Sequence, residues 1–521
     1  MKGGGTVKYV KVMITNLIQF FEKTASVYSD TVAIRDAETS VSFGALKAQE
    51  TKYADWLATT YQTTRRPVAV FLPKCAHTIA VDLAIIHSGN AYMNMDVKTP
   101  QERLANVLKQ AQPLCIITNE KFHGTIAQIA GDVPIVLVED LDKLEACEGA
   151  EERLNVIIEQ GIDTDPLCLI NTSGSTGTPK CVVLNHRSFF DFMACAFETW
   201  KMEDGMVVGS LSPVIFDIYS FELCLLCAKR ATLVLIPDGW AMFPVKILEL
   251  IQREKVSWIF WVPTIMVNMA NIGLLEKMPL PDLKTVWFAG EVFPTKQFNV
   301  WKRNLPWARF VNLYGPIEIT LDCTWFEVTR EFRDDEPLPI GFPCRNTDIL
   351  ILNADNKPVV GDEEGELCVR GTSLAMGYYN NPEKTAAAFT QNPLNAAYPE
   401  IIYRTGDIVS RNERGEILFK GRKDTLIKHS GYRIELGEIE HVIINTLKLV
   451  PNGCVVYNKA EKVIVFFYES GRELSAGEFR KAIGQVLPKY MIPSDFRHLA
   501  ELPRGGTGKI DRALLNRQVN G

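Results

Sequence analysis

The sequence lacks the features that mark membrane, secreted and nucleic-acid-binding proteins. None of its apolar runs reaches the roughly 20 residues that span a bilayer. Its first residues contain neither a continuous signal-peptide core nor a cleavage site. The 56 basic and 62 acidic residues leave a net charge of −6, so no basic surface for nucleic acid or anionic lipid is predicted. We therefore expect a cytoplasmic protein without a nucleic-acid or membrane partner.

The sequence also lacks repeated cysteine motifs. Its 12 cysteines are scattered, as expected for reduced and partly buried thiols. Cys224 and Cys227 have the spacing of metal ligands, but they lie in the apolar run 221–228, and no second Cys or His pair follows at a suitable distance. Packing on a helix face is the favoured interpretation, with metal or redox chemistry as the alternative.

What the chain does have is an alternation of short β-rich runs with helical patterns. The predicted strands are 67–71, 114–118, 134–138, 167–170, 232–237 and 258–262, and the predicted helices include 189–200, 218–228 and 245–255. This alternation indicates α/β layers with largely parallel sheets. After about Asn346 the strands become short and closely spaced, which predicts a smaller β-rich unit. A mixed α+β tail follows from about Asp424.

The most informative segment is the hydroxyl-rich run from Asn171 to Lys180. It follows a predicted strand, and its small residues allow backbone N–H and side-chain O–H groups to approach phosphate oxygens closely. Its spacing differs from the P-loop, which places four residues between its first Gly and Gly-Lys-Ser/Thr. An ordinary Ser/Gly turn is the alternative, but the length and composition favour phosphate binding.

From this segment outward, the chain resembles the adenylate-forming superfamily, which includes acyl-CoA synthetases, luciferases and amino-acid adenylation enzymes. The resemblance covers nearly the whole chain, with the motifs in the family's order. The matching segments are 88–92, 99–104, 172–180, 312–318, 365–367, 377–379, 403–407, 421–424, 431–440, 487–493 and 508–512. Within the superfamily, the chain is similar to freestanding adenylation domains of nonribosomal peptide synthesis and to D-alanine–carrier protein ligases.

The resemblance implies a fold and a division of the chain. The expected fold is α/β, with a large N-terminal core of two α/β sheet subdomains plus a β-rich subdomain from about residue 346. A small, mobile α+β C-terminal domain completes it. The core would span residues 1–423 and the C-terminal domain residues 424–521. The family rotates this domain at a hinge, matched here by Asp424, between adenylation and thioester formation.

The resemblance also implies which residues serve ATP and Mg²⁺. Lys509 would be the catalytic lysine, Lys428 a second lysine that serves thioester formation, and Glu318 the Mg²⁺ ligand through a hard oxygen. Tyr314 would stack on adenine, and Asp407 would accept hydrogen bonds from the ribose hydroxyls. The full set of expected ATP-binding residues is Thr172, Ser173, Gly174, Ser175, Thr176, Gly177, Lys180, Gly290, Asn312, Tyr314, Gly315, Asp407 and Arg422. Taken singly, these residues also suit turns, core positions and surface ion pairs.

Phe216 and Asp217 resemble the Phe-Asp pair of amino-acid-activating members, in which the aspartate binds the substrate ammonium. Capping of the helix 218–228 is the alternative for Asp217, and a buried aspartate requires a cationic partner. By the same matching, the amino-acid pocket would also contain Ile218, Phe221, Phe260, Trp287, Ala289, Leu313, Leu321 and Asp322. Core packing, and a surface position for Asp322, are the alternatives.

Bulky aromatic walls and one added carboxylate favour a small side chain that carries a donor. Serine is favoured, and glycine, L-alanine and D-alanine stay open, because one methylene is worth only about 1–3 kcal/mol of discrimination. The predicted reaction is ATP-dependent formation of aminoacyl-AMP with release of pyrophosphate, followed by transfer to a phosphopantetheine thiol. No carrier domain follows Lys509 in the sequence, so a monomeric enzyme that loads a separate carrier protein in trans is expected.

Two departures from the family pattern keep alternatives open. Cys181 stands where glycine is usual, and Ile317 stands where threonine is usual, so one hydroxyl donor to phosphate is missing. Such a donor is worth on the order of 1–3 kcal/mol, and Thr320 is a candidate to replace it. The alternatives are an acyl-CoA or aryl-acid ligase, against which Asp217 argues, and a nucleotide-binding regulator without turnover, which Ile317 alone supports.

Overall fold

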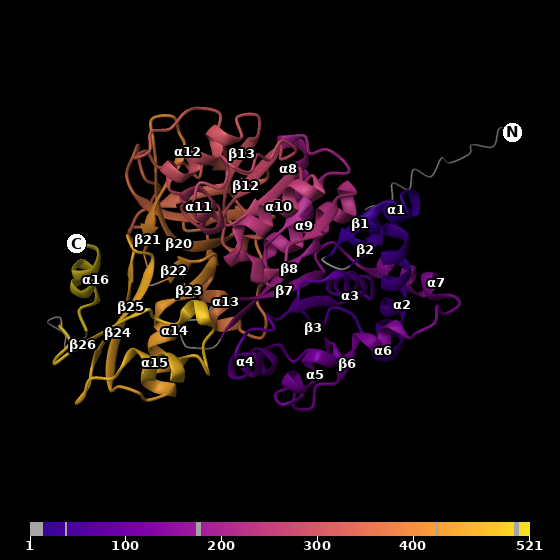
Figure 1. Cartoon of the computed structure of the whole chain (residues 1–521), viewed down its shortest axis with the longest axis horizontal. Coiled ribbons are helices and arrows are strands. Elements are labelled where there is room, and N and C mark those ends of the chain that lie inside the picture. The colour runs from indigo at the N-terminus through magenta and orange to yellow at the C-terminus, as the bar shows by residue number, and fades with distance from the viewer. Residues whose placement is uncertain (1–13, 37–38, 173–178, 424–425, 505–509) are drawn as a thin grey trace.

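The structure is a computed structural model that describes residues 14–36, 39–172, 179–423, 426–504 and 510–521 (Figure 1). It confirms the predicted α/β class: helices cover sheets that are parallel in their centres. Among the described residues, no helix combines the length and apolar character needed to cross a membrane. The predicted residues 173–177, Asp424 and Lys509 lie outside the described residues.

The larger sheet has nine strands and carries most of the expected amino-acid pocket. Its six central strands run parallel, and the strands at its two edges are antiparallel. Their order is β15 (Phe342–Pro343), β14 (Thr324–Glu327), β13 (Arg309–Tyr314), β12 (Thr285–Phe288), β11 (Trp258–Trp261), β9 (Val207–Ser210), β10 (Thr232–Leu235), β1 (Val32–Arg35) and β2 (Ser40–Ser42). Strands β10 and β11 are buried throughout, as expected for parallel strands covered on both faces.

A second sheet of seven strands lies beside the first and carries the strands that flank the predicted phosphate loop. Its order is β18 (Gly377–Tyr378), β8 (Lys180–Asn185), β7 (Pro166–Thr172), β4 (Ala91–Asn94), β3 (Pro67–Phe71), β5 (Ile116–Thr118) and β6 (Ile135–Leu137). Strand β3 has the predicted bounds. The predicted strand 134–138 is one residue shorter at each end: it begins at Ile135, and Val138 already begins a helix.

Helices connect and cover these two sheets (Figure 1). In the first part of the chain they are α1 (Ile18–Val27), α2 (Phe43–Tyr61), α3 (Ala76–His87), α4 (Gln101–Ala111), α5 (Glu120–Ala127), α6 (Val138–Asp142) and α7 (Ala150–Gln160). In the second they are α8 (His186–Trp200), α9 (Asp217–Lys229), η1 (Asp238–Met242), α10 (Pro244–Glu254), α11 (Pro263–Asn271), α12 (Thr295–Asn304) and η2 (Ile317–Ile319).

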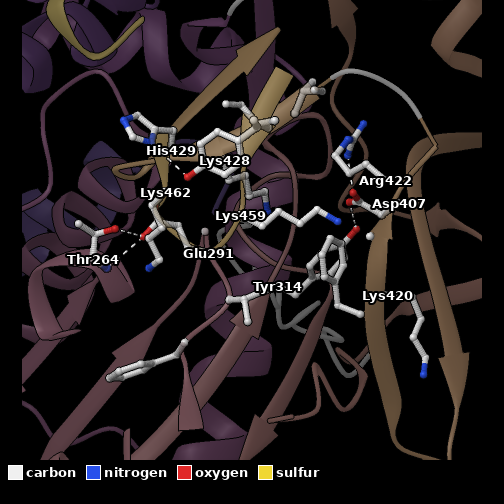
Figure 2. A pocket seen from close by; sticks show the side chains of 18 of the residues that line it. Thr264, Glu291, Tyr314, Asp407, Lys420, Arg422, Lys428, His429, Lys459 and Lys462 are labelled. Carbon is white, nitrogen blue, oxygen red and sulfur yellow. Dashed lines mark hydrogen bonds and ion pairs between the residues drawn. The ribbon is translucent and has the colours of Figure 1, made fainter. Parts of the chain in front are cut away.

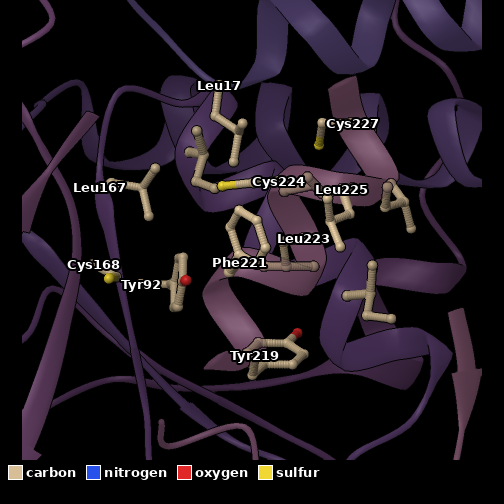
Figure 3. Packing of buried hydrophobic residues seen from close by; sticks show 14 of the residues in the cluster. Leu17, Tyr92, Leu167, Cys168, Tyr219, Phe221, Leu223, Cys224, Leu225 and Cys227 are labelled. Atoms are coloured by element: carbon tan, nitrogen blue, oxygen red, sulfur yellow. The ribbon is translucent and has the colours of Figure 1, made fainter. Parts of the chain in front are cut away.

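Helix α9 lies in the largest hydrophobic core, which joins residues of both sheets (Figure 3). Cys224 and Cys227 on this helix are fully buried among Leu, Phe and Tyr side chains. In the part of the chain that the structure describes, no group of three or more His, Cys, Asp or Glu residues could hold a metal ion. The packing interpretation of this cysteine pair is therefore confirmed.

The described residues of the rest of the chain form three smaller sheets. The first is β-rich and contains β16 (Thr347–Leu352), β17 (Gly365–Gly371), β20 (Ile401–Arg411), β19 (Phe389–Gln391) and β21 (Ile417–Arg422), with α13 (Pro382–Ala388) beside it. The C-terminal unit begins with a hairpin of β22 (Leu426–His429) and β23 (Tyr432–Glu435). The C-terminal unit then contains α14 (Leu436–His441), η3 (Val442–Thr446), β24 (Asn452–Asn458), β25 (Val463–Glu469), α15 (Ala476–Ile483), η4 (Lys489–Met491), β26 (Asp495–Leu499) and α16 (Arg512–Asn520).

Candidate active site

A cavity of about 700 Å³ lies between the core and the C-terminal unit (Figure 2). Strand β13 of the core and the segment after β12 form one wall, β20 and β21 of the β-rich sheet form another, and the β22–β23 hairpin closes it. Seven of the predicted site residues line it: Gly290, Asn312, Leu313, Tyr314, Asp407, Arg422 and Lys428. Residues that the resemblance assigns to adenine, ribose and thioester formation are thus brought together from four strands and the turn after β12.

Asp407 is held in this cavity by two side-chain hydrogen bonds. It is 1% exposed, and the Tyr314 hydroxyl and the Arg422 guanidinium each donate to one of its oxygens. Asp407 and Arg422 face each other in the register of β20 and β21, so the sheet itself sets this ion pair. Each carboxylate oxygen keeps a second lone pair, so the group can still accept hydrogen bonds from a ligand hydroxyl.

Lys428, on β22 of the C-terminal unit, lines the same cavity as Asp407. Its ammonium nitrogen lies 5.3 Å from the centre of the Tyr314 ring, over its face, which is a cation–π arrangement. Burial lowers the pKa of Lys428, and the charge of Asp407 only partly opposes this effect. In the described part of the chain no hydrogen bond or ion pair involves its ammonium group, so its protons are free for a ligand anion.

Glu318 lies deeper, in η2, and is fully buried. The Tyr378 hydroxyl donates to its Oε1 at 2.8 Å, and Nη1 of Arg433 lies 2.5 Å from its Oε2. Burial alone would raise the pKa of Glu318, but the positive charges of Arg433 and Lys180 and the Tyr378 hydroxyl hold it below its usual value. Glu318 therefore belongs to a buried ion pair. The alternative from the sequence, a surface ion pair, is wrong for this residue.

The donor chemistry around Glu318 fits a magnesium ion. Mg²⁺ is usually held by one or two carboxylates together with substrate phosphates and water, not by an all-protein cage. Glu318 supplies one hard carboxylate, and two nearby elements carry buried hydroxyls, Thr172 and Thr320, without a partner among the described residues. Bound there, the ion would neutralise charge on phosphate oxygens. In the described arrangement, Arg433 occupies the carboxylate.

The backbone after η2 is tightly constrained. A side chain at Gly315 would place its Cβ 2.2 Å from the carbonyl oxygen of Leu321, so only glycine fits there. Thr320 and Leu321 both adopt positive φ angles of 54° and 66°, a conformation that β-branched and bulky residues rarely take. This close approach joins the predicted adenine motif to the residues expected in the amino-acid pocket.

The strands that flank the predicted phosphate loop are regular. Lys180 begins β8 and places its ammonium nitrogen 5.1 Å from the centre of the Tyr378 ring, and burial lowers its pKa. Cys181 is 1% exposed and pairs with Asn171 in the register of β7 and β8. The thiol in place of the usual glycine is thus accommodated in a continuous β-ladder.

Asp217 is the first residue of α9, and Phe216 before it is the N-cap residue. Its Oδ2 accepts the backbone N–H of Leu321 at 3.0 Å, so the carboxylate joins α9 to the strained loop. Burial raises the pKa of Asp217 to about 6. No Lys, Arg or His of the described residues forms an ion pair with it. Asp217 therefore lies one residue inside the N-cap position that the capping alternative gives it, and Phe216 at that position makes no side-chain cap hydrogen bond.

The expected walls of the amino-acid pocket are aromatic and closely packed. The Trp287 ring lies 5.7 Å from Phe221 in a stacked arrangement and 5.6 Å from Phe260 edge to face. All three side chains are fully buried, and Ile218, Ala289, Leu313 and Leu321 are buried beside them. The Trp287 indole N–H finds no partner among the described residues.

Asp322 is buried as well, at 4% exposure, so its interpretation as a surface residue is wrong. Burial and the charge of Asp217 raise the pKa of Asp322 well above its usual value, against the influence of Lys428. A carboxyl group in this setting favours its protonated form. It then offers a hydroxyl donor and a carbonyl acceptor to whatever lies against it.

Sequence reasoning missed the residues that join the C-terminal hairpin to the core. Arg433 was part of a matched motif but had no assigned role. Glu291 accepts the Gly431 N–H at 2.7 Å and the Thr264 hydroxyl at 2.5 Å. Arg103 on α4 pairs with the buried Glu438 on α14. The pairs Glu291–Gly431 and Arg103–Glu438 have no signal in one sequence, because their partners are more than 100 residues apart and depend on how the two units dock.

Comparisons with known proteins identify the family of the chain. A model of the AMP-binding enzyme family matches residues 21–379. The chain is 29% identical to D-alanine--D-alanyl carrier protein ligase of Lacticaseibacillus casei (strain BL23), covering 98% of this chain and 100% of that protein. It is 30% identical to a mycosubtilin synthase protein of Bacillus subtilis, covering 95% of this chain but 19% of that protein. The chain likewise spans 36% and 44% of two further curated relatives, Delta-poly-L-ornithine synthetase and tyrocidine synthase 1.

A solved structure has the same fold. The adenylation domain AlmE of Vibrio cholerae, crystallised with glycyl-adenosine-5'-phosphate, superposes with a TM-score of 0.83 at 19% identity and covers 99% of each chain. The chain therefore belongs to the AMP-binding enzyme family. It is an adenylate-forming enzyme of the type found in nonribosomal peptide synthetase adenylation domains and D-alanine–carrier protein ligases.

Proposed function

We propose that this chain activates a small amino acid with ATP and passes the activated acyl group to the phosphopantetheine thiol of a separate carrier protein. In the first half-reaction the amino-acid carboxylate attacks the α-phosphorus of ATP, aminoacyl-AMP forms and pyrophosphate leaves. In the second, the thiol attacks the acyl carbon and AMP leaves. Catalysis of this kind depends on positioning and electrostatic stabilisation, because no covalent protein nucleophile is needed.

The observation that carries the proposal is the unpaired carboxylate of Asp217. It stands half-buried at the start of α9 and accepts one backbone N–H, from Leu321. A carboxylate so placed is costly unless a cation joins it, and the described residues supply none. The ammonium group of an amino acid meets this requirement, whereas a fatty or aryl acid would leave Asp217 without a counter-charge.

The walls of the pocket support a small substrate. The Trp287 ring contacts both Phe221 and Phe260, so little side-chain volume fits beside them. Asp322 offers polar atoms among apolar neighbours, and a hydroxyl-bearing side chain would use them. Serine is therefore our first choice, ahead of glycine and either enantiomer of alanine.

Nucleotide binding would use the cavity at the domain interface. Asp407 and Arg422 would hold the ribose, Tyr314 would take the adenine, and Lys428 would face the phosphate or the carbonyl group during thioester formation. Lys509, which lies outside the described residues, would serve the first half-reaction. The division at residues 423 and 424, with Asp424 as the hinge, belongs to the same proposal.

Pyrophosphate exchange measured across all amino acids, with both enantiomers of alanine and serine, tests the first half-reaction. We expect one small amino acid to dominate, and Lys509→Ala to remove the exchange. Exchange that depends on a fatty or aryl acid instead would overturn the assignment. So would tight ATP binding without any acid-dependent exchange, which would indicate a regulator.

Transfer is tested separately by mass spectrometry of a phosphopantetheinylated carrier protein incubated with the chain, ATP and the preferred amino acid. We expect a mass increase on the carrier thiol that matches the aminoacyl group. The matched control is the same carrier without its phosphopantetheine arm. An unmodified carrier in the presence of active exchange would refute the transfer step and leave the adenylation step standing.

A further inference from the structure

The most tightly engaged acid of the site receives its cation from the C-terminal unit. Glu318 belongs to η2 of the core, and Arg433 lies on β23, 115 residues further along the chain. Their closest atoms are 2.5 Å apart, and the two side chains are 0% and 15% exposed. This pair connects the expected metal ligand directly to the hairpin that also carries Lys428.

Both oxygens of the Glu318 carboxylate are engaged. Tyr378 donates to Oε1 and Arg433 to Oε2. A magnesium ion needs an oxygen ligand at about 2.0–2.1 Å and near-octahedral surroundings filled by water and phosphate. A guanidinium at hydrogen-bond distance from the same oxygen fills that space and repels the cation. The two cations therefore compete for one carboxylate.

Arg433 cannot easily withdraw while the hairpin stays in place. It also hydrogen-bonds Tyr403, and the hairpin tip is held by the Gly431 N–H bond to Glu291. A side chain at Gly431 would meet Val262 at 3.1 Å, and the Tyr432 ring lies 5.3 Å from the ring of Phe216. Separating the two charges with the hairpin still docked would break an ion pair in a shielded site, which is strongly unfavourable.

We propose that Arg433 is a positioning residue that replaces Mg²⁺ at Glu318 whenever the C-terminal unit is docked in this arrangement, so that docking and metal binding exclude each other. The inference rests on the proposed use of ATP and Mg²⁺. It gives the two half-reactions an order: Arg433 takes over the carboxylate only after metal-bound pyrophosphate has left, and the hairpin then presents Lys428 to the cavity.

The test is a Mg²⁺ titration of the full-length chain with a non-hydrolysable ATP analogue, without amino acid or carrier. Arg433→Gln removes the competing charge, so it should lower the Mg²⁺ concentration that half-saturates nucleotide binding by about tenfold, if about nine tenths of the wild-type protein is docked. Arg433→Lys keeps a cation and should stay close to wild type.

Small-angle X-ray scattering of the same samples gives a readout that is independent of affinity. Mg²⁺ with the nucleotide analogue should change the scattering profile of the wild type, and a chelator should restore it. Arg103→Gln is the matched comparison, because it breaks the other ion pair between the units, with Glu438, and leaves Arg433 in place. It should lower the Mg²⁺ requirement less than Arg433→Gln.

Equal Mg²⁺ half-saturation in the wild type, Arg433→Lys and Arg433→Gln would overturn the proposal. A docked scattering profile that persists with Mg²⁺ and nucleotide bound would also overturn it. If Arg433→Gln fails to fold, wild-type scattering and the Arg433→Lys titration still decide. If no amino acid supports pyrophosphate exchange but Arg433 still competes with Mg²⁺, the proposed function alone is refuted. If the enzyme is active but Arg433→Gln has the Mg²⁺ dependence of the wild type, this inference alone is refuted.

Discussion

The nucleotide side and the amino-acid side of the site each contain a shielded carboxylate, and the protein treats the two in opposite ways. Glu318 receives a guanidinium and a hydroxyl, and its pKa is lowered. Asp217 receives backbone N–H donation but no side-chain cation among the described residues, and burial raises its pKa to about 6. The difference indicates that the protein neutralises Glu318 itself and leaves Asp217 for a ligand.

The largest effect should come from breaking the internal pair. Glu318→Gln removes the carboxylate that forms the ion pair with Arg433 in a shielded site, so the free energy of unfolding should fall by about 3–5 kcal/mol. Denaturant unfolding checks this. The control is Asp335→Asn, which removes an ion pair whose side chains are 78% and 81% exposed and should cost no more than about 1 kcal/mol. Equal losses in the two variants would contradict the assignment of a buried pair.

Neutralising the unpaired carboxylate should affect substrate more than stability. Asp217→Asn removes the charge-assisted bond to the ammonium group, worth about 1.5–3 kcal/mol. The kcat/KM for the amino acid should therefore fall by roughly ten- to a hundredfold in pyrophosphate exchange, with the KM for ATP nearly unchanged. Glu120→Gln is the control, since Glu120 is also an acid in the first turn of a helix but is exposed. Unchanged exchange in Asp217→Asn would remove this chain from the amino-acid-activating branch.

The two carboxylates should also respond differently to pH. As the pH falls through about 6, Asp217 gains a proton and loses its charge, so the KM for the amino acid should rise about tenfold per pH unit below that value. The lowered pKa of Glu318 keeps it ionised over the same range, so the KM for ATP should change much less. Steady-state pH profiles of both KM values measure this, and a parallel rise of the two would contradict it.

The smallest effect should come from restoring the missing hydroxyl. Ile317→Thr supplies a donor beside Glu318 and should raise kcat by about fivefold, equivalent to about 1 kcal/mol. Ile317→Val is the control, because it trims the side chain without adding a donor. Its partly buried position against the core predicts a small loss of stability in both variants. If neither variant raises kcat, the hydrogen bond to phosphate is already donated by Thr320 or by the backbone.

Much of the fold was predictable from pattern alone. Strand β3 has the predicted bounds, and α8, α9 and α10 begin and end within three residues of their predicted positions. Local periodicity decides these elements, because each buries one continuous apolar stretch. Interpretations of single polar residues were less secure. Asp322 was assigned a surface alternative but is buried, and Asp217 was considered a cap but is the first helical residue.

The partners of the site residues were the least predictable part. Tyr314 and Asp407 meet although 93 residues separate them, and Arg433 meets Glu318 across 115 residues. The matching motifs contain all four residues and assign roles to three of them, but they do not give the contacts between them. Such contacts depend on the docking of whole units, which is the sum of many small interactions that no local window contains.

By itself, the sequence determined the family, the α/β class and the identities of the chemical groups, since each motif needs particular residue types at a particular spacing. Only the tertiary structure decided which of these groups are already neutralised. It pairs Glu318 with Arg433, places Lys428 over Tyr314 and leaves Asp217 without a protein cation among the described residues. The physical reason is that charge compensation in a shielded site depends on the neighbours within a few ångströms, and those neighbours come from strands and helices that are distant in the chain.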